Sequence, residues 1–227
     1  MPRSLGVVPD LAMWLQTFED GARADALLTG GGGIPLAGDI ASALARLHAA
    51  AVPAARRHDL AREIAILREQ LSDARRAAPA LARRIDGVER GCVRLAERIA
   101  PARATGIHRD LHPEQVLVRR DGGIVLLDLD LFAWGDPLID VANFAAHLVE
   151  LGVREHGDAA ALDDARAVFE ETWLRLQAHA LRRDLERHRA LAIARHVAIS
   201  QRIPARRATT EAVLAAAEGA LAAERVL

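Results

Sequence analysis

Two carboxylates and an amide stand close together in the sequence, and their types and spacing could support a chemical reaction. Asp110 lies in the segment His-Arg-Asp, and Gln115 follows it five residues later. Asp128 comes 18 residues after Asp110 and directly follows the apolar run of residues 124–127. A loop carboxylate can hold or deprotonate a hydroxyl, and an amide with a second carboxylate can hold Mg²⁺. This combination is what phosphoryl transfer from ATP needs on its catalytic side.

Three nearby side chains have less certain uses in such a site. Asp130 points to the same side of a strand as Asp128, so it could be a second metal ligand or an outer contact. His108 and His112 are four residues apart, a spacing that can hold zinc on a helix. No helix aligns them here, because Pro113 follows at once. We therefore expect His108 to form hydrogen bonds within the loop and His112 to brace Asp110.

The elements around these residues predict a small β-hairpin within a helical protein. Residues 116–119 and 124–128 read as two strands, joined by an Asp-Gly-Gly turn at residues 121–123. Residues 5–18 look extended, with a break at Pro9. The fold class is therefore α+β and mainly α.

Helical patterns occupy most of the remaining sequence. Asp39 is a plausible N-cap for a helix over residues 40–50, and residues 20–39, with four glycines at 30–33, read as a loop. Pro101 ends a helical hairpin. The expected helices cover residues 40–50, 58–76, 81–99, 137–151, 158–180, 183–201 and 208–225. Asp136 is expected to cap the helix that starts at 137.

Composition excludes several classes of function. The net charge of the 227 residues is −1, which argues against a nucleic-acid partner or a polybasic membrane contact. No apolar run approaches the ~20 residues of a membrane span, and no signal peptide is evident. The single cysteine, Cys92, falls on the apolar stripe of a helix and is expected to be buried. A cytoplasmic location fits these features.

The basic residues are all arginine, and the sequence contains neither lysine nor tyrosine. This absence bears directly on phosphoryl transfer, because many kinases place a lysine on the nucleotide phosphates. A lysine cannot fill that role in this chain.

The motif-bearing segment resembles the aminoglycoside phosphotransferase/choline kinase-like family. The matching stretches are HRDLHPEQVLV, LLDLDL and WGDPLIDVA, which together occupy residues 106–142. The family pattern is roughly H-G-D-L-H-x-x-N-x-L, then I-D-W/F, then G-D-P-x-x-D-L-A. The order of the motifs, the spacing of the two aspartates and the Gly-Asp-Pro tail all agree.

The resemblance implies a protein-kinase-like C-terminal lobe with defined roles for several residues. Asp110 would be catalytic, Asp128 and Gln115 would bind Mg²⁺, and Asp140 would be structural. Residues 22–227 would form the C-lobe, and residues 1–21 would be a remnant of the N-lobe strands and the hinge. Gln16, Thr17 and Phe18 would then lie near the adenine of ATP.

Two departures from the family pattern weaken the expected activity. Gln115 replaces the usual Asn, which adds one methylene to the metal ligand. The N-lobe that would cover the phosphates has no counterpart in the sequence, so an upstream or separate N-lobe is a possible partner. Both a fragment of a longer protein and a degenerate kinase fit these features. We expect the chain alone to bind ATP weakly and to turn over slowly.

The expected function is transfer of the γ-phosphoryl group of ATP to a hydroxyl of a small acceptor. The sequence leaves the acceptor open among sugars, amino alcohols and other hydroxyl compounds, held among the helices of residues 137–225. One alternative is a pseudokinase or partner-binding helical module. Another is a haloacid-dehalogenase-like phosphatase, in which Asp128 would be the nucleophile and Asp130 the acid/base. The helical pattern after Asp136 argues against the phosphatase.

Overall fold

The computed structural model describes residues 2–30, 32–100, 102–177 and 180–227, and most of them are helical. The helices are α1 Ala24–Leu28, α2 Gly33–Ala49, α3 Leu60–Ala77, α4 Ala82–Ala96, α5 Leu138–His156, α6 Asp163–Leu176, α7 Arg182–Arg202 and α8 Thr210–Ala223. Short 3-10 turns lie at η1 Pro9–Leu11, η2 Pro79–Leu81, η3 Pro113–Gln115 and η4 Pro204–Thr209. The strands are β1 Ser4–Val8, β2 Met13–Gln16, β3 Ala22–Arg23, β4 Arg57–His58, β5 Thr105–Ile107, β6 Val116–Val118, β7 Ile124–Leu126 and β8 Ala133–Gly135. The expected mainly helical α+β fold is confirmed.

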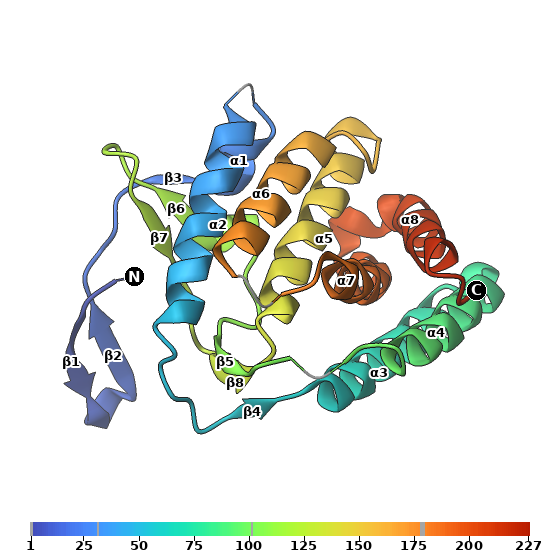
Figure 1. Cartoon of the computed structure of the whole chain (residues 1–227), viewed down its shortest axis with the longest axis horizontal. Helices are drawn as coiled ribbons and strands as arrows, with labels where there is room; N and C mark the ends of the chain where they lie inside the picture. Colours follow the sequence, from blue (N-terminus) through green and yellow to red (C-terminus); the bar gives the residue numbers. More distant parts are fainter. Residues whose placement is uncertain (1, 31, 101, 178–179) are drawn as a thin grey trace.

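The helices pack around α5, which is buried along most of its length because apolar residues occupy nearly all its faces. Helix α7 packs against α5 on one side, and α6 packs against both α5 and α2. The α3–α4 hairpin contacts α7, and α8 closes the far end against α7 and α4. Figure 1 shows α7 lying between α5 and this hairpin. The expected helical hairpin is thereby confirmed.

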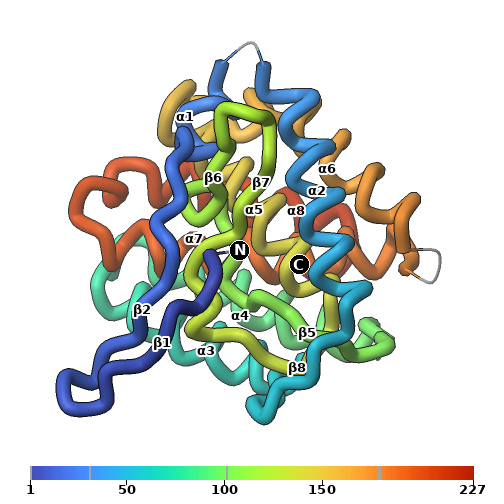
Figure 2. Tube along the Cα trace, turned by 90° about the vertical axis from the view of Figure 1, so that its left-hand side faces the viewer, coloured from blue at the N-terminus to red at the C-terminus, as the bar shows by residue number. Residues whose placement is uncertain are grey.

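Two small three-stranded sheets lie at the edge of the helical core and hold the motif-bearing segment. One has the order β3-β6-β7, and the other has the order β4-β8-β5. In the first sheet β6 and β7 form the expected antiparallel hairpin, with Val116 opposite Leu126 and Val118 opposite Ile124. In the second sheet β4 runs parallel to β8, and β5 runs antiparallel to it. Figure 2 shows β6 next to β7 and, lower in the view, β5 near β8.

The prediction of a loop over residues 20–39 is wrong. Strand β3 and helix α1 occupy its first part, and α2 begins at Gly33 rather than at residue 40. Asp39 is therefore exposed in the middle of a helix and is not its N-cap. Pro35 is compatible with this early start, because a first-turn residue has no intrahelical donor to lose. Within the glycine run, Gly31 lies outside the described residues.

Other predicted boundaries were close to the observed ones. Helix α3 begins one residue after Asp59, whose side chain accepts a hydrogen bond from the Arg62 N–H at 2.8 Å. Asp136 lies one residue before Pro137, the N-cap of α5, and its Oδ1 accepts the N–H of the first helical residue, Leu138, at 2.8 Å. Helix α6 ends at Leu176, so the prediction that the helix continues to residue 180 is wrong. Residues 178–179 of that predicted stretch lie outside the described residues. Pro101 also lies outside them.

Cys92 is buried as predicted, with 1% of its surface exposed. Burial raises the pKa of its thiol to about 12, so the residue serves as a small apolar group of the core.

The β1–β2 hairpin stands apart from both sheets and from the helical core. It forms its own two-stranded antiparallel sheet, with a bend at Pro9 as the sequence predicts. None of its described residues is buried, although many are apolar. Figure 1 shows the hairpin projecting at the side where the chain begins.

Among the described helices, none combines the length and the apolar composition needed to cross a bilayer.

Candidate active site

Asp128 lies two residues after the end of β7, where the backbone leaves the direction of the strand. The Asp-Gly-Gly turn closes the hairpin, with Gly122 at a φ of 80° and the Asp121 side chain accepting the Gly123 N–H at 2.9 Å. Strand β7 stops at Leu126, and Asp128 has a φ of 58°, which few non-glycine residues adopt. This left-handed turn gives Asp128 an exposed carboxylate beside the loop that precedes β6.

Gln115 and Asp128 come together as the sequence predicts. Gln115 is 9% exposed, and its Nε2 donates a hydrogen bond to Asp128 Oδ2 at 3.2 Å. Its buried Oε1 has no hydrogen-bond partner among the described residues. A rotation of the amide about its last bond would bring this oxygen toward Asp128. Two oxygen donors would then face one point, which suits a hard cation such as Mg²⁺.

Asp110 lies on the loop between β5 and η3, with its side chain half-buried. No hydrogen bond from the described residues reaches its carboxylate, whereas its neighbours in the loop are fixed. Arg109, just before it, has a φ of 75°, so the backbone is held in an uncommon conformation. The loop thus presents a carboxylate that remains free to accept a proton from another molecule.

Asp140 of α5 holds this loop in place. Its carboxylate is fully buried and accepts the His108 N–H at 2.7 Å and the Arg109 N–H at 2.6 Å. His48 Nε2 lies 2.9 Å from the same carboxylate. Two successive backbone donors on one carboxylate enforce the turn that leads into Asp110. Asp140 therefore holds Arg109 by its backbone N–H.

The protonation of His48 follows from its second contact. Trp173 Nε1, an obligatory donor, lies 3.1 Å from His48 Nδ1, which must therefore be the acceptor. The proton of the neutral ring is then on Nε2, where it is donated to Asp140. Both rings are buried, so His48 of α2 and Trp173 of α6 support the Asp140 carboxylate.

A second chain of contacts fixes the far end of the loop. Asn143 of α5 donates its Nδ2 to the Leu111 carbonyl at 2.9 Å, and its Oδ1 accepts from Arg195. Arg195 also reaches Glu63 at 3.2 Å, and Glu63 accepts from His58 at 2.7 Å. Helices α3, α5 and α7 thus meet strand β4 in one network behind the loop.

The remaining sequence candidates have mixed outcomes. His108 is fully buried, and its ring bonds the Leu127 carbonyl at 2.7 Å. The expected bond within the loop is therefore wrong, because the ring links the loop to the segment that carries Asp128. His112 does not pair with it in a metal site. Instead it stacks on His147, with the ring centroids 4.9 Å apart. Asp130 is exposed, and its backbone carbonyl accepts a hydrogen bond from Arg56 at 2.8 Å.

Residues 16–18, proposed to lie near adenine, follow the exposed hairpin. Gln16 ends β2, and the Thr17 N–H donates to the Arg3 carbonyl at 2.9 Å. The Phe18 ring is 89% exposed, so a planar ligand could stack on it. The chain then passes close to β6, where a Cβ on Gly21 would meet the Val118 carbonyl oxygen at 2.8 Å. At this point the chain passes from the β1–β2 hairpin to the β3-β6-β7 sheet, and Gln115 directly precedes β6 of that sheet.

Sequence reasoning missed most of the supporting residues. His48, Glu63, Asn143 and Arg195 were not singled out as parts of the site, and they lie on four helices, α2, α3, α5 and α7. The one available signal was the Ala-Arg-Leu-His end of α2, which resembles the first C-lobe helix of the family. Glu63 and Arg195 each look like ordinary charged positions on a helix surface.

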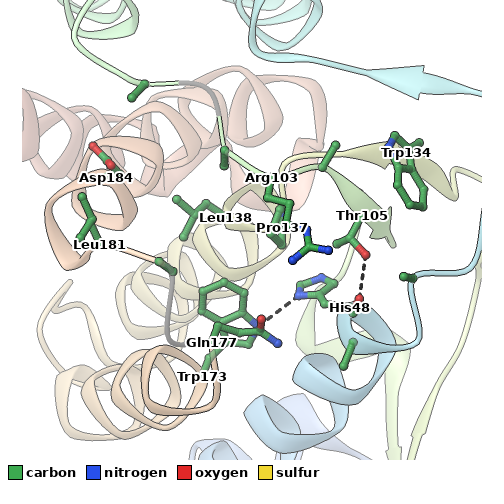
Figure 3. Close-up of a pocket in the computed structure, with 16 residues that line it drawn as sticks. His48, Arg103, Thr105, Trp134, Pro137, Leu138, Trp173, Gln177, Leu181 and Asp184 are labelled. Atoms are coloured by element: carbon green, nitrogen blue, oxygen red, sulfur yellow. Dashed lines mark hydrogen bonds between the residues drawn. The ribbon is translucent and has the colours of Figure 1, made fainter.

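A pocket lies next to this support and away from Asp110. Its volume is about 500 Å³, and His48, Thr105, Trp134 and Trp173 are among its lining residues. Figure 3 shows His48 and Trp173 facing this space from two helices. Asp110, Gln115 and Asp128 do not line it, so a ligand there would contact the support of the loop rather than its carboxylate.

The fold and the site together define a class, the phosphotransferases with a kinase-like catalytic lobe. The comparison with family models agrees. The model of the phosphotransferase enzyme family matches residues 26–179, which include the catalytic loop, the Asp128 segment and helix α5. The chain belongs to this family.

Several solved structures with the same fold are named as small-molecule kinases. A choline/ethanolamine kinase family protein from Mesorhizobium loti is 16% identical and has a TM-score of 0.63, with coverage of 97% of this chain and 74% of that one. Choline kinase LicA from Streptococcus pneumoniae is 13% identical, with a TM-score of 0.61 and coverage of 98% and 74%. A glucosamine kinase in complex with glucosamine, ADP and inorganic phosphate is 19% identical, with a TM-score of 0.65 and coverage of 100% and 64%. This chain therefore spans about two thirds to three quarters of their length.

No curated protein sequence matches this chain.

The family membership removes the phosphatase alternative. Haloacid-dehalogenase-like enzymes need alternating strands and helices after the nucleophile, whereas the described chain after Gly135 contains helices and 3-10 turns only.

Proposed function

We propose that this protein transfers the γ-phosphoryl group of ATP to a hydroxyl of a small acceptor, with Asp110 as the residue that receives the hydroxyl proton. The observation that carries the proposal is the free carboxylate of Asp110 on a loop whose backbone is fixed by Asp140. A carboxylate already engaged by neighbouring donors would be a poor base. A free one on a rigid loop can orient an incoming hydroxyl and accept its proton as the phosphorus–oxygen bond forms.

Asp128 and Gln115 are the proposed holders of Mg²⁺. Their contact at 3.2 Å and the unpartnered Gln115 Oε1 support this assignment. When bound, Mg²⁺ would neutralise charge on the nucleotide phosphates. Two protein oxygens suit an ion that also binds phosphate, so we expect Mg²⁺ and ATP to depend on each other for binding.

The adenine side of the nucleotide is proposed to lie along residues 16–18, with Phe18 as the exposed ring. The first 21 residues would then be the hinge side and residues 22–227 the catalytic lobe. Contacts to the outer phosphates must come from arginine, from backbone N–H groups or from an additional N-lobe, because the chain has no lysine. The exposed apolar side chains of the β1–β2 hairpin support such a lobe as a partner.

The acceptor is proposed to be a small amino alcohol or amino sugar. The support is indirect: choline, ethanolamine and glucosamine are named for the kinases with the same fold. Neutral sugars and simple diols are the contrasting class.

The test is an ADP-release assay on a panel of small hydroxyl compounds, with choline, ethanolamine, glucosamine, glucose and glycerol as the first members. We expect acceptor-dependent ADP release for at least one amine-bearing member, and the phosphorylated product should be identified by mass spectrometry. Asp128→Asn should abolish the mutual dependence of Mg²⁺ and ATP binding, whereas the exposed Asp130→Asn should retain it.

Two results would count against the proposal. One is ATP binding by the intact chain without any transfer across the panel, which favours a pseudokinase. The other is tight Mg²⁺ binding without nucleotide, which the two-oxygen site does not allow.

A further inference from the structure

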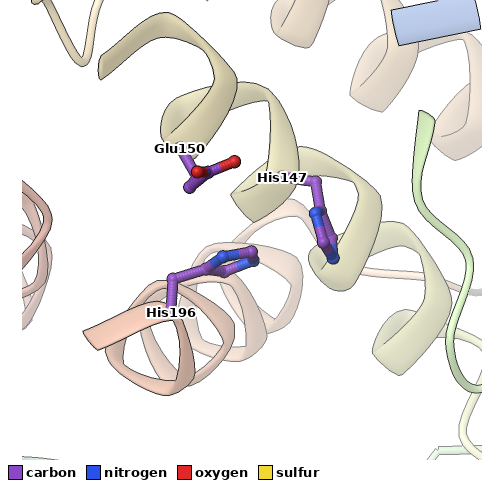
Figure 4. Close-up of side chains that lie close together, drawn as sticks. All are labelled: His147, Glu150 and His196. Carbon is purple, nitrogen blue, oxygen red and sulfur yellow. The ribbon is translucent and has the colours of Figure 1, made fainter. Parts of the chain in front are cut away.

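Two histidines and a glutamate converge between α5 and α7, outside the site described above. His147 and Glu150 are three residues apart on α5 and therefore share a face of that helix. His196 faces them from α7. One ring nitrogen of each histidine and a carboxylate oxygen all lie within 4.8 Å of one another. Figure 4 shows the three side chains pointing into the space between the two helices.

These groups lack the partners that buried polar atoms normally have. His196 is 1% exposed, and neither of its ring nitrogens has a hydrogen-bond partner among the described residues. The Glu150 carboxylate is 2% exposed, and its Oε1 is also without a hydrogen bond there. Buried polar groups are satisfied in the great majority of folded proteins. An unsatisfied nitrogen and oxygen that face each other therefore indicate a missing third group.

Burial shifts the pKa of each member of the cluster toward its neutral form. It lowers the pKa of His196 to about 3 and that of His147 well below its ordinary value, and it raises the pKa of Glu150. A neutral imidazole keeps one nitrogen lone pair, which is the group that binds a metal.

Two arginines near Glu150 offer a competing explanation. Arg154 Nε lies 3.3 Å from Oε1, and Arg206 Nη1 lies 3.7 Å from Oε2. Neither contact has hydrogen-bond geometry, and Arg206 is also 3.3 Å from Glu114. The two arginines lie near the buried carboxylate but form no hydrogen bond with its oxygens. They do not touch the unsatisfied nitrogens of His196.

A small pocket borders two of the three members of the cluster, and His196 does not line it. This pocket of about 10 Å³ borders His147 and Glu150 and is also lined by His112, Glu114 and Arg206. That is room for about one water molecule or one metal ion.

We propose that His147, Glu150 and His196 bind one Zn²⁺ ion. Two imidazole nitrogens and one carboxylate oxygen are a ligand set that zinc uses, with a fourth position for water. Mg²⁺ prefers oxygen ligands throughout, which separates this cluster from the pair Asp128 and Gln115. Ligands about 2.1 Å from a common ion lie roughly 3–4 Å apart, so small side-chain rotations would close the site.

Such an ion would join α5 to α7 directly behind the catalytic loop. His112, two residues after Asp110, stacks on the His147 ring, and His147 meets His196 edge to face with the ring centroids 4.3 Å apart. Zinc would fix the His147 ring and, through that stack, one side of the loop.

The decisive measurement is zinc binding by the untagged full chain after treatment with a chelator. Titration against a chromophoric zinc indicator should show one tight equivalent per chain, and Co²⁺ should give the visible absorption of a low-coordinate nitrogen–oxygen site. Asp128→Asn should leave the zinc stoichiometry unchanged, because the proposed Mg²⁺ site is separate. A wild-type chain without a stoichiometric zinc equivalent would overturn the proposal without recourse to any variant.

Variants then locate the ion. Glu150→Gln and His196→Gln should each weaken zinc binding by at least ~10-fold, since each removes a direct ligand. His147→Gln, at a half-buried position, is the substitution least disturbing to the fold. His156→Gln, on the exposed end of the same helix, is the matched control and should bind zinc like the wild type. Binding that survives all three ligand changes, with circular dichroism showing folded protein, would assign the zinc to another part of the chain.

Discussion

At the scale of single residues, the geometry of the catalytic loop depends on one fully buried carboxylate. Asp140 receives two backbone N–H groups and the His48 ring, and Trp173 sets the tautomer of that ring. The three bonds to Asp140 are accepted by a carboxylate and are therefore stronger than bonds between neutral groups. Because no described residue forms a hydrogen bond with the Asp110 carboxylate, the position of Asp110 depends on the contacts of Asp140 with the loop.

Replacing Asp140 with Asn should damage both stability and turnover. The amide has one oxygen where the carboxylate has two, and its NH₂ would face a donor. We expect a loss of about 2–4 kcal/mol in the free energy of unfolding and a lower kcat. Urea unfolding measures the first quantity. Asp39→Asn, at an exposed position on α2, is the control and should change neither stability nor kcat. An Asp140→Asn protein as stable as the wild type would mean that the loop keeps its conformation without this carboxylate.

Glu63 gives the network behind the loop a defined pH dependence. Burial alone would raise the pKa of Glu63, but the hydrogen bond from His58 and the charge of Arg195 outweigh it and lower the pKa from 4.5 to about 2. A pKa that is depressed in the folded state stabilises the fold above about pH 4.5, and this contribution is lost as the pH falls toward 2.

The predicted result is a pH-dependent difference between the wild type and Glu63→Gln. The contribution of the ionised carboxylate, on the order of 3 kcal/mol, should disappear from wild-type unfolding between about pH 4.5 and pH 2. Glu63→Gln should lack that part of the curve. Parallel curves for the two proteins, measured by urea unfolding at each pH, would rule out the assigned role of this carboxylate.

At the scale of elements, the three-stranded sheet of β4, β8 and β5 depends on a glycine. A Cβ on Gly135 would collide with the His58 carbonyl and lie 2.7 Å from Ile107 Cδ1. The neighbouring strands approach so closely because Gly135 has no side chain.

Gly135→Ala should therefore separate β4 from β8 and cost about 1–3 kcal/mol of stability. Gly219→Ala on α8 is the matched control, since nothing lies within 4 Å of the added Cβ. It should stabilise the protein by about 0.5–1 kcal/mol, because alanine favours helix. The midpoints of thermal unfolding should thus move in opposite directions, and equal shifts would refute the close-packing argument.

The elements that sequence could predict are those with local signals. The turn of the β6–β7 hairpin is predicted by Asp-Gly-Gly, and α3 and α4 show apolar periodicity over several turns. Strands β3, β4, β5 and β8 are two or three residues long, too short for an alternating pattern to appear. The start of α2 was missed because glycines normally break helices, and here one begins the helix.

Within the site, sequence predicted the pair Gln115 and Asp128 but not the support of the loop. The pair is 13 residues apart across one hairpin, and the hairpin register brings it together. His48 is 92 residues from Asp140, and Arg195 is 132 residues from Glu63. Such contacts depend on how helices pack, which a single sequence does not reveal.

At the scale of the whole molecule, the helical core and the β1–β2 hairpin are energetically separate. The main cluster of buried apolar residues extends from α1 to Val226, and a smaller one comprises Ile107, Ala133 and Ile139. No residue of the hairpin belongs to either cluster. The large exposed apolar side chains of this region are Leu5, Val7, Leu11, Met13, Trp14, Leu15 and Phe18. The hairpin therefore adds apolar surface without adding buried area.

Deletion of residues 1–16 should leave the core intact. We expect the midpoint of thermal unfolding to change by less than about 2–4 °C, the shift that 1 kcal/mol produces in a domain of this size. Solubility should rise, because the deletion removes exposed apolar groups. Cooperative unfolding that disappears with the deletion would show that the hairpin is part of the core after all.

The central claim is that the free carboxylate of Asp110 performs the proton transfer, and its most direct test is Asp110→Asn. With an acceptor found by the panel, kcat should fall at least ~100-fold, the usual effect of losing a positioned base. The thermal midpoint should stay within a few degrees, because the carboxylate bonds no described residue. Asp164→Asn, an exposed carboxylate on α6, should keep full activity. Near-wild-type turnover by Asp110→Asn, or its failure to fold, would contradict the assignment.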